Sequence, residues 1–156
     1  DIDADWTKKN GERHFGYKDH VKCDADSKLI TNYSVTSASV HDSQRCLVFI
    51  GQEDEVLYAD SAYSGKPIAL ALPENCKNQI CEKGYRNSPL TSEQKMNNRR
   101  KSRIRCRIEQ IFGFMTGAMH GITIRSIGIT RAWMNIGITN LVYNFCRYSY
   151  LKGASA

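Results

Sequence analysis

The stretch Arg99–Phe112, with the sequence RRKSRIRCRIEQIF, carries two patterns on what we expect to be one long helix. Apolar side chains recur at positions 104, 108, 111, 112 and 115, which is the spacing of a single helical stripe. Arg105 and Glu109 lie one helical turn apart at the edge of that stripe. Because arginine counters phosphate charge, a carboxylate set among arginines is suited to chemistry on a nucleic-acid backbone.

Strand and helix patterns alternate through the rest of the chain. Residues 56–59 (VLYA) predict a short buried strand that ends at Asp60. The first part of the chain predicts a polar loop at 1–11 and a hairpin of strands 15–23 and 29–35 around a turn at 24–27. A helix from a capping box at 39–42 to Gly51, the strand 56–60, a small helix to residue 72 and a strand at 79–82 are expected next. The long helix then begins at a capping box formed by Thr91 and Gln94, and a last helix is expected at about 130–148. This mixture predicts an α/β or α+β domain.

Positive charge is concentrated in one part of the chain. The 156 residues carry a net charge of +6, and 41% of them are hydrophobic, which is enough for a core. The segment Lys83–Arg107 holds nine Lys/Arg and one acid, a net charge of +8, whereas the rest holds thirteen bases and fifteen acids. A basic block on a nearly neutral body indicates a polyanionic partner. A solvated charged helix face is the alternative.

Six cysteines are spread along the chain, and only Cys76 and Cys81 are close in sequence. One C-x4-C pair is a weak indication of zinc, and cysteines on apolar faces act as small hydrophobic residues. With no signal peptide and no long apolar run, a reduced cytoplasmic location is expected. The chain opens at Asp1 in a polar segment without an initiator Met, so we expect it to be part of a larger protein.

Several segments together resemble one known family, the bacterial insertion-sequence DDE transposases, whose catalytic domain is ribonuclease H-like. Single segments are weak, but their order along the chain is specific. They are Asp3–Lys9 (DADWTKK), His14–His20 (HFGYKDH), Val35–Ser43 (VTSASVHDS), Ala59–Tyr63 (ADSAY), Arg105–Gly113 (RCRIEQIFG) and Asn140–Asn144 (NLVYN).

The resemblance implies a mixed sheet flanked by helices, in which residues 1–156 form a partial catalytic domain without its first strand. Asp60 falls on the family's second catalytic Asp, and Glu109 falls on its Glu in the pattern Arg-x3-Glu that begins at Arg105. The first Asp lies on the strand that we expect to be missing, and the acids nearest to that strand are Asp1, Asp3 and Asp5. Where the family often has Tyr and Lys around this pattern, the chain has Ser102 and Thr116.

The implied function is metal-dependent DNA cleavage and strand transfer at insertion-sequence ends, here by a truncated fragment. Asp60 and Glu109 would bind Mg²⁺ or Mn²⁺. DNA would be the partner, the location would be the bacterial nucleoid, and a homodimer is left open. The expected DNA-binding residues are Arg99, Arg100, Lys101, Arg103 and Arg107. A non-catalytic DNA-binding remnant is the alternative, followed by an interaction module that uses the basic helix.

Each candidate site residue also has a plain structural interpretation. An Asp at a strand end is ordinarily a turn or cap residue, as Asp60 could be. Glu109 could be the i−4 ion-pair partner of Arg105, and this role is compatible with metal binding. His41 and Asp42 could contact a phosphate backbone, but they also stand where a helix N-terminus would be capped.

Overall fold

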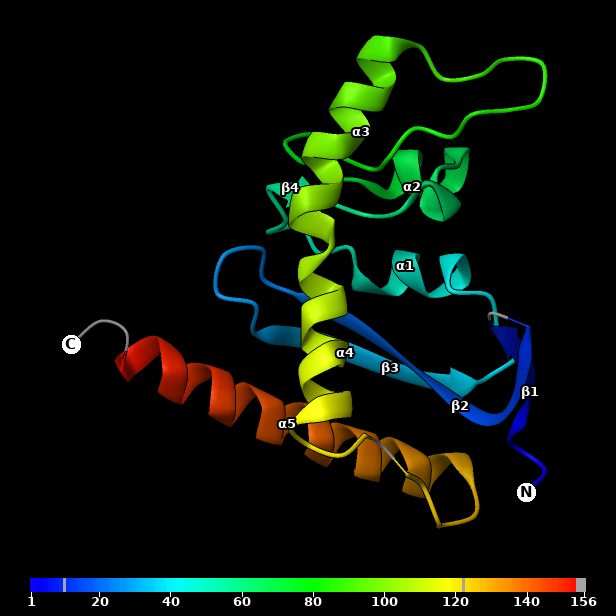
Figure 1. Cartoon of the computed structure of the whole chain (residues 1–156), viewed down its shortest axis with the longest axis vertical. Coiled ribbons are helices and arrows are strands. Elements are labelled where there is room, and N and C mark those ends of the chain that lie inside the picture. Colours follow the sequence, from blue (N-terminus) through cyan, green and yellow to red (C-terminus); the bar gives the residue numbers. More distant parts are fainter. Residues whose placement is uncertain (10, 122, 154–156) are drawn as a thin grey trace. The chain divides into compact units, whose positions relative to one another are not determined.

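A three-stranded antiparallel sheet and one long helix make up the first part of the structure (Figure 1). The computed structural model describes residues 1–9, 11–121 and 123–153. The chain divides into two compact units, one formed by Asp1–His41 with Gln110–Ala156 and the other by Asp42–Glu109. The mixture of strands and helices in the described residues confirms the α/β class at this level.

Strands β2 (Glu12–Cys23) and β3 (Ile30–Ser37) form the predicted hairpin. Their register places Asp19 opposite Val35 and Val21 opposite Tyr33. The turn between the strands is fixed by the Asp24 carboxylate, which accepts hydrogen bonds from the Ser27 backbone N–H at 2.7 Å and from the Ser27 hydroxyl at 2.6 Å. These bonds hold the pKa of Asp24 below its usual value. The expected turn at 24–27 is therefore confirmed, and its physical basis is an Asx-type turn.

The expected polar loop at 1–11 is wrong in its middle. Residues Asp5–Lys9 form β1, which pairs with the first part of β2 from Asp5 opposite Gly16 to Lys9 opposite Glu12. Trp6 and Phe15 face each other across this pair with ring centroids 5.2 Å apart. Both rings remain about half exposed, so the strand is held mainly by its backbone ladder.

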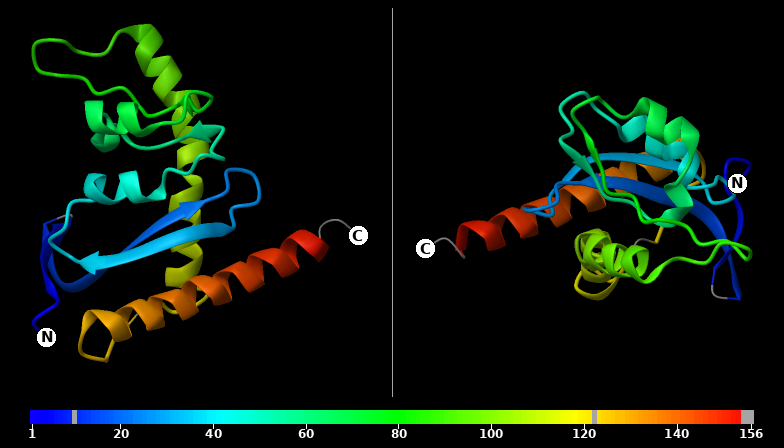
Figure 2. Two further views of the ribbon diagram at one scale, coloured as in Figure 1. Left: turned by 180° about the vertical axis from the view of Figure 1, so that it is seen from behind. Right: turned by 90° about the horizontal axis from the view of Figure 1, so that it is seen from above.

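Helix α5 (Ile129–Gly153) packs on β3, and the predicted last helix is confirmed (Figure 2). The core between them contains Val35, Ala132 and Ile136, all of which are buried, with Tyr33 against it. Gly137 lies at this contact: a Cβ at this position would collide with the hydroxyl and Cζ of Tyr33, so the glycine permits close packing.

The motif Asn140–Asn144 fastens α5 to the hairpin. The Asn144 side chain accepts from Ile30 N and donates to Ile30 O, both at 2.8 Å. One residue earlier, the Tyr143 hydroxyl donates to Lys28 O at 3.0 Å. These bonds occupy backbone polar groups at the first residue of β3 and in the turn before it. The motif therefore has a structural role in the described residues.

Asp19 is a half-buried residue, and its carboxylate contacts α5. Its Oδ1 accepts a hydrogen bond from Asn140 Nδ2 at 3.3 Å. Among the described residues, neither Asp19 Oδ2 nor Asn140 Oδ1, both buried, has a hydrogen-bond partner. Burial raises the pKa of Asp19 to about 6. These two acceptors favour the protonated form of Asp19, because a protonated carboxyl could donate a hydrogen bond to Asn140 Oδ1.

The N-terminal acids bind the start of α5. Asp1 Oδ2 accepts from the Tyr17 hydroxyl at 2.7 Å and from Gly128 N at 3.1 Å, and Asp3 Oδ2 accepts from Ile129 N at 3.0 Å. These backbone N–H groups are among those that a helix leaves unsatisfied at its N-terminus. Asp1 and Asp3 therefore cap α5 from a distant part of the sequence.

The second unit is built around two short parallel strands, β4 (Val56–Leu57) and β5 (Lys77–Asn78). Helices α1 (Ser43–Phe49) and α2 (Lys66–Ala71) contact each other beside them (Figure 1). The core contains the buried residues Cys46, Ile68 and Ile80. Cys46 thus acts as a small hydrophobic residue, as predicted. The strand expected at 79–82 lies two residues earlier, at β5.

The predicted long helix is interrupted at Cys106, and the structure divides it into α3 (Ser92–Arg105) and α4 (Arg107–Gly117). The capping box at its start is confirmed, since Thr91 Oγ1 accepts from Gln94 N at 3.2 Å and Gln94 Oε1 accepts from Thr91 N at 2.9 Å. The capping box expected at residues 39–42 is wrong: Asp42 is the N-cap of α1, and its side chain makes no capping bond.

Candidate active site

Asp60 stands where the parallel strand pairing ends. Backbone hydrogen bonds from Gln79 N to Leu57 O and from Cys81 N to Ala59 O extend the pairing beyond the two strands, at 2.9 and 3.0 Å. Asp60 follows directly and is exposed. Its Oδ1 accepts from Ser61 N and so caps the short 3₁₀ helix η1 (Ser61–Tyr63). The capping interpretation of Asp60 is thus confirmed, and Oδ2 remains available to a ligand.

The pKa of Tyr63 depends on the charges of both Asp60 and Asp42. The Tyr63 ring packs against the core of the second unit, and burial raises its pKa to about 12, with further contributions from the charges of Asp42, Cys46 and Asp60. Two carboxylates therefore act on one hydroxyl. Asp42 and Asp60 are both exposed residues of the second unit.

Glu109 and Arg105 form the predicted ion pair across the helix interruption. Arg105 Nη2 lies 2.9 Å from Glu109 Oε1, and the Glu109 side chain is 62% exposed against 28% for that of Arg105. An arginine that is largely covered is a more fixed partner than a fully solvated one, because fewer of its rotamers remain accessible. The pair therefore restrains one carboxylate oxygen of Glu109 and leaves the other facing solvent.

The inner face of α3 is attached to the segment that follows β5. Asn98 accepts from Glu82 N and donates to Glu82 O, each at 2.9 Å. Lys101 Nζ donates to Ile80 O at 2.9 Å and lies 4.0 Å from Glu82 Oε1. The Lys101 side chain is only 16% exposed, so the structure places it at this attachment rather than at the surface.

Three arginines of the basic block are exposed on α3. Arg99, Arg100 and Arg103 are exposed, whereas Arg107 is half-buried. Among the described residues, no carboxylate forms an ion pair with any of the three exposed arginines. They are consequently free to meet an external anion. The expected DNA-binding set therefore contains three surface cations and two residues, Lys101 and Arg107, that are partly covered.

The residues present are suited to a divalent cation but do not enclose one. Asp60 and Glu109 each offer a carboxylate oxygen to solvent, and hard cations such as Mg²⁺ prefer oxygen ligands. Within residues 1–9, 11–121 and 123–153, no group of three or more His, Cys, Asp or Glu is arranged to hold a metal. This applies to Cys76 and Cys81 as well. Metal binding by Asp60 and Glu109 remains a prediction.

His41 is the last residue of the first unit and is exposed, while Asp42 begins the second unit. A contact of His41 or Asp42 with a phosphate backbone remains a prediction. Sequence reasoning did not predict that the charges of Asp42 and Asp60 both contribute to the raised pKa of Tyr63. It also did not predict that Lys101 Nζ donates a hydrogen bond to Ile80 O, in a segment about twenty residues earlier.

The sequence of residues 2–145 matches the Transposase DDE domain family, and the chain belongs to this family. The match covers most of the chain and includes Asp60, Arg105 and Glu109. The resemblance seen in the sequence segments is therefore confirmed. Transposases act on DNA.

Among individual proteins, the chain is similar to a transposase for insertion sequence element IS1106 from Neisseria meningitidis serogroup B. The two are 34% identical over 116 residues, which is 72% of this chain and 40% of that protein. The chain thus spans less than half the length of this relative. No solved structure matches the chain. In the described part of the chain, no helix has both the length and the apolar composition needed to cross a membrane.

Proposed function

We propose that this chain contributes Asp60 and Glu109 to the catalytic site of a transposase that cleaves DNA at insertion-sequence ends and transfers the strand. The domain would have a ribonuclease H-like fold, of which the hairpin, β4 and the two helices α3 and α4 are parts. The observation that carries the proposal is the Arg105–Glu109 pair on a basic helix, in a chain of the DDE family that also exposes Asp60 at a strand end.

Asp60 and Glu109 would hold Mg²⁺ or Mn²⁺ through the carboxylate oxygens that face solvent. A bound divalent cation supplies activation of the attacking oxygen and stabilisation of the leaving oxygen in phosphoryl transfer. The chain's own part is to keep the ligands in place. The η1 turn fixes Asp60 through Ser61 N, and Arg105 fixes Glu109. Restrained ligands favour a single metal geometry.

The exposed arginines of α3 would bind the DNA backbone. Arg99, Arg100 and Arg103 are exposed cations on the same helix that ends at Arg105. Glu109 follows the last residue of α3 by four positions. A phosphate backbone bound along this helix would therefore lead toward Glu109. DNA binding by Arg107, a homodimer and an association with the nucleoid remain predictions. The first catalytic Asp and the upstream strand would come from elsewhere in the full transposase.

A non-catalytic DNA-binding role is the second candidate. It is favoured by the observation that the described residues contain no cluster of three metal-binding side chains. Nicking of supercoiled plasmid in Mn²⁺ separates the two candidates. If the chain is catalytic, the protein extended by an upstream strand with its Asp should nick the plasmid, and Asp60→Asn should abolish the nicking. A binding role expects unchanged plasmid with and without that strand.

Calorimetric titration with Mn²⁺ tests the proposal directly. Asp60→Asn and Glu109→Gln keep the side-chain size and remove the charge that a hard cation requires, so each should abolish measurable binding. Glu93→Gln, at an exposed acid on α3, is the matched control and should bind as the wild type does. Equal Mn²⁺ affinity in the wild type and both site variants would rule out these carboxylates as ligands.

A further inference from the structure

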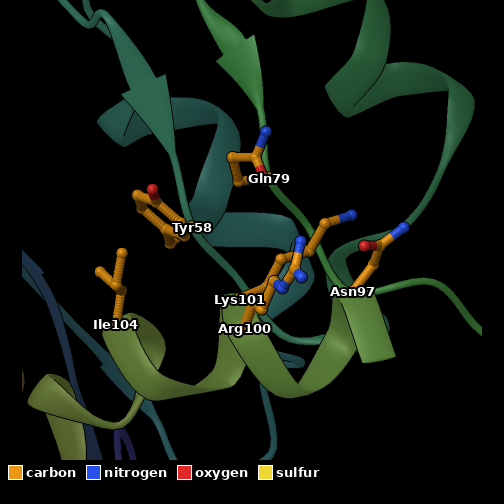
Figure 3. Close-up of a pocket in the computed structure, with 6 residues that line it drawn as sticks. All are labelled: Tyr58, Gln79, Asn97, Arg100, Lys101 and Ile104. Carbon is orange, nitrogen blue, oxygen red and sulfur yellow. The ribbon is translucent and has the colours of Figure 1, made fainter. Parts of the chain in front are cut away.

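The strongest unassigned feature is a cavity of about 470 Å³ in the second unit (Figure 3). Tyr58 and Gln79 line it from the strand side. The other lining residues come from α3 and are Asn97, Arg100, Lys101 and Ile104. Figure 3 shows these four side chains extending from α3 toward the side on which Tyr58 and Gln79 lie. Of the lining residues, Tyr58 is two residues before Asp60 in sequence, and Ile104 directly precedes Arg105.

The lining chemistry matches a nucleotide. Tyr58 and Ile104 are half-buried and offer an aromatic face and an apolar wall. Gln79 and Asn97 carry amides, which donate and accept hydrogen bonds, as the edge of a base requires. No acid lines the cavity, and Lys101 Nζ is already bonded to Ile80 O. Arg100 is therefore the cation left to meet a phosphate.

The size and shape decide what form of nucleotide fits. Ligand pockets are typically about 300–1,000 Å³, so this cavity is large enough for one small ligand and too small for a duplex. A base that is stacked inside a duplex presents only its edge, whereas an unstacked base can enter a concave site and lie against an aromatic ring.

We infer that this cavity binds one unpaired nucleotide of the DNA strand, with its base against Tyr58 and between the amides of Gln79 and Asn97, and its phosphate on Arg100. The inference rests on the proposed function, because the nucleotide belongs to the DNA on which the domain acts. It adds a set of residues, directly after β4 and β5 and along α3, that would distinguish DNA with a locally opened strand from fully paired DNA.

Fluorescence anisotropy with the whole chain tests the inference. Two labelled duplexes of equal length are compared, one fully paired and one with a single unpaired nucleotide. Stacking and base-edge bonds should favour the unpaired substrate by roughly ten-fold. Asn97→Ala and Gln79→Ala, at partly exposed positions, should remove most of this preference while the affinity for paired DNA stays the same. Met96→Ala, a half-exposed neighbour on α3 outside the cavity, is the control and should keep the preference.

A second measurement reports the contact with Tyr58. With 2-aminopurine as the unpaired base, binding should change its fluorescence through stacking, and Tyr58→Leu should remove that change. Circular dichroism shows whether this variant folds, and the Asn97 variant keeps the test decisive if it does not. A duplex whose unpaired nucleotide is abasic should bind no more tightly than the fully paired duplex.

The outcomes separate the inference from the function on which it rests. If both duplexes bind equally and the cavity variants change nothing, the nucleotide subsite is wrong while DNA binding stands. If neither duplex binds, the proposed function fails together with the subsite. Displacement of the unpaired substrate by free deoxynucleoside monophosphate at matched concentration would also overturn the inference, because it would assign the cavity to a free nucleotide.

Discussion

Replacing Asp19 by Asn should stabilise the unit that contains the sheet at neutral pH. In the wild type, ionised Asp19 leaves its own Oδ2 and Asn140 Oδ1 as buried acceptors without a partner among the described residues. An Asn at position 19 can donate from its amide to Asn140 Oδ1 while its own oxygen accepts from Asn140 Nδ2. The exchange therefore removes a buried charge and satisfies an orphaned oxygen.

The magnitude follows from the pKa of Asp19, which burial raises from 3.8 to about 6. A group whose pKa is higher in the folded state binds its proton more tightly there, so its contribution to stability is full below the unfolded pKa and is lost as pH rises through the folded pKa. The raised pKa corresponds to a loss of about 3 kcal/mol between pH 4 and pH 7. Asp19→Asn should therefore be more stable than the wild type by up to about 3 kcal/mol at pH 7.5 and by much less at pH 4.

Urea unfolding monitored by tryptophan fluorescence measures this difference, since both tryptophans, Trp6 and Trp133, belong to the first unit. The quantity that matters is the difference between the variant and the wild type at each pH, because Asp24 and other carboxylates titrate in both proteins. Glu74→Gln, at an exposed acid, is the control and should follow the wild-type curve. A variant that is less stable than the wild type at pH 7.5, or a difference that does not change from pH 4 to 7.5, would refute the reasoning.

Two further changes test the basic helix and the packing of α5. Reversing the charge at Arg99, Arg100 and Arg103 to Glu should weaken DNA binding and flatten the log–log salt dependence by about 0.9 for each lost phosphate contact, and an unchanged slope in a salt titration would count against a DNA-binding face on α3. Gly137→Ala should destabilise the first unit by about 1 kcal/mol or more in urea unfolding because the new Cβ collides with the Tyr33 hydroxyl. In a Tyr33→Leu background, which lacks both the hydroxyl and the Cζ that a Cβ at position 137 would meet, the same exchange should become neutral or favourable by up to about 1 kcal/mol, and an equal effect in both backgrounds would show that this collision does not occur.

The elements that the sequence predicted well are those defined by local patterns. Alternating residues around the turn at 24–27 specify the hairpin, and the 3.6-residue spacing specifies the helices. The pair Arg105–Glu109 was predictable for the same reason, since an i,i+4 contact depends on one helix. It persists even though the helix is interrupted at Cys106.

The parts that the sequence did not predict depend on contacts between distant segments. Strand β1 has no apolar alternation, and it forms because its backbone pairs with β2. Asp1 and Asp3 could not be recognised as caps, because the helix that they cap begins more than 120 residues later. Lys101 looked like a surface cation until its partner, Ile80 O, was known. For the candidate site, composition and spacing thus indicate which residues are charged, while tertiary contacts decide which charges remain exposed.

The most direct test of the central claim is paramagnetic broadening of backbone amide NMR signals by substoichiometric Mn²⁺ in the 156-residue chain. If Asp60 and Glu109 hold the metal, the signals of residues around 60 and around 109 should broaden first and together, and Asp60→Asn should abolish the broadening at both places. Broadening that occurs at other acids, or that persists around residue 109 in the Asp60→Asn variant, would contradict a metal site shared by these two carboxylates.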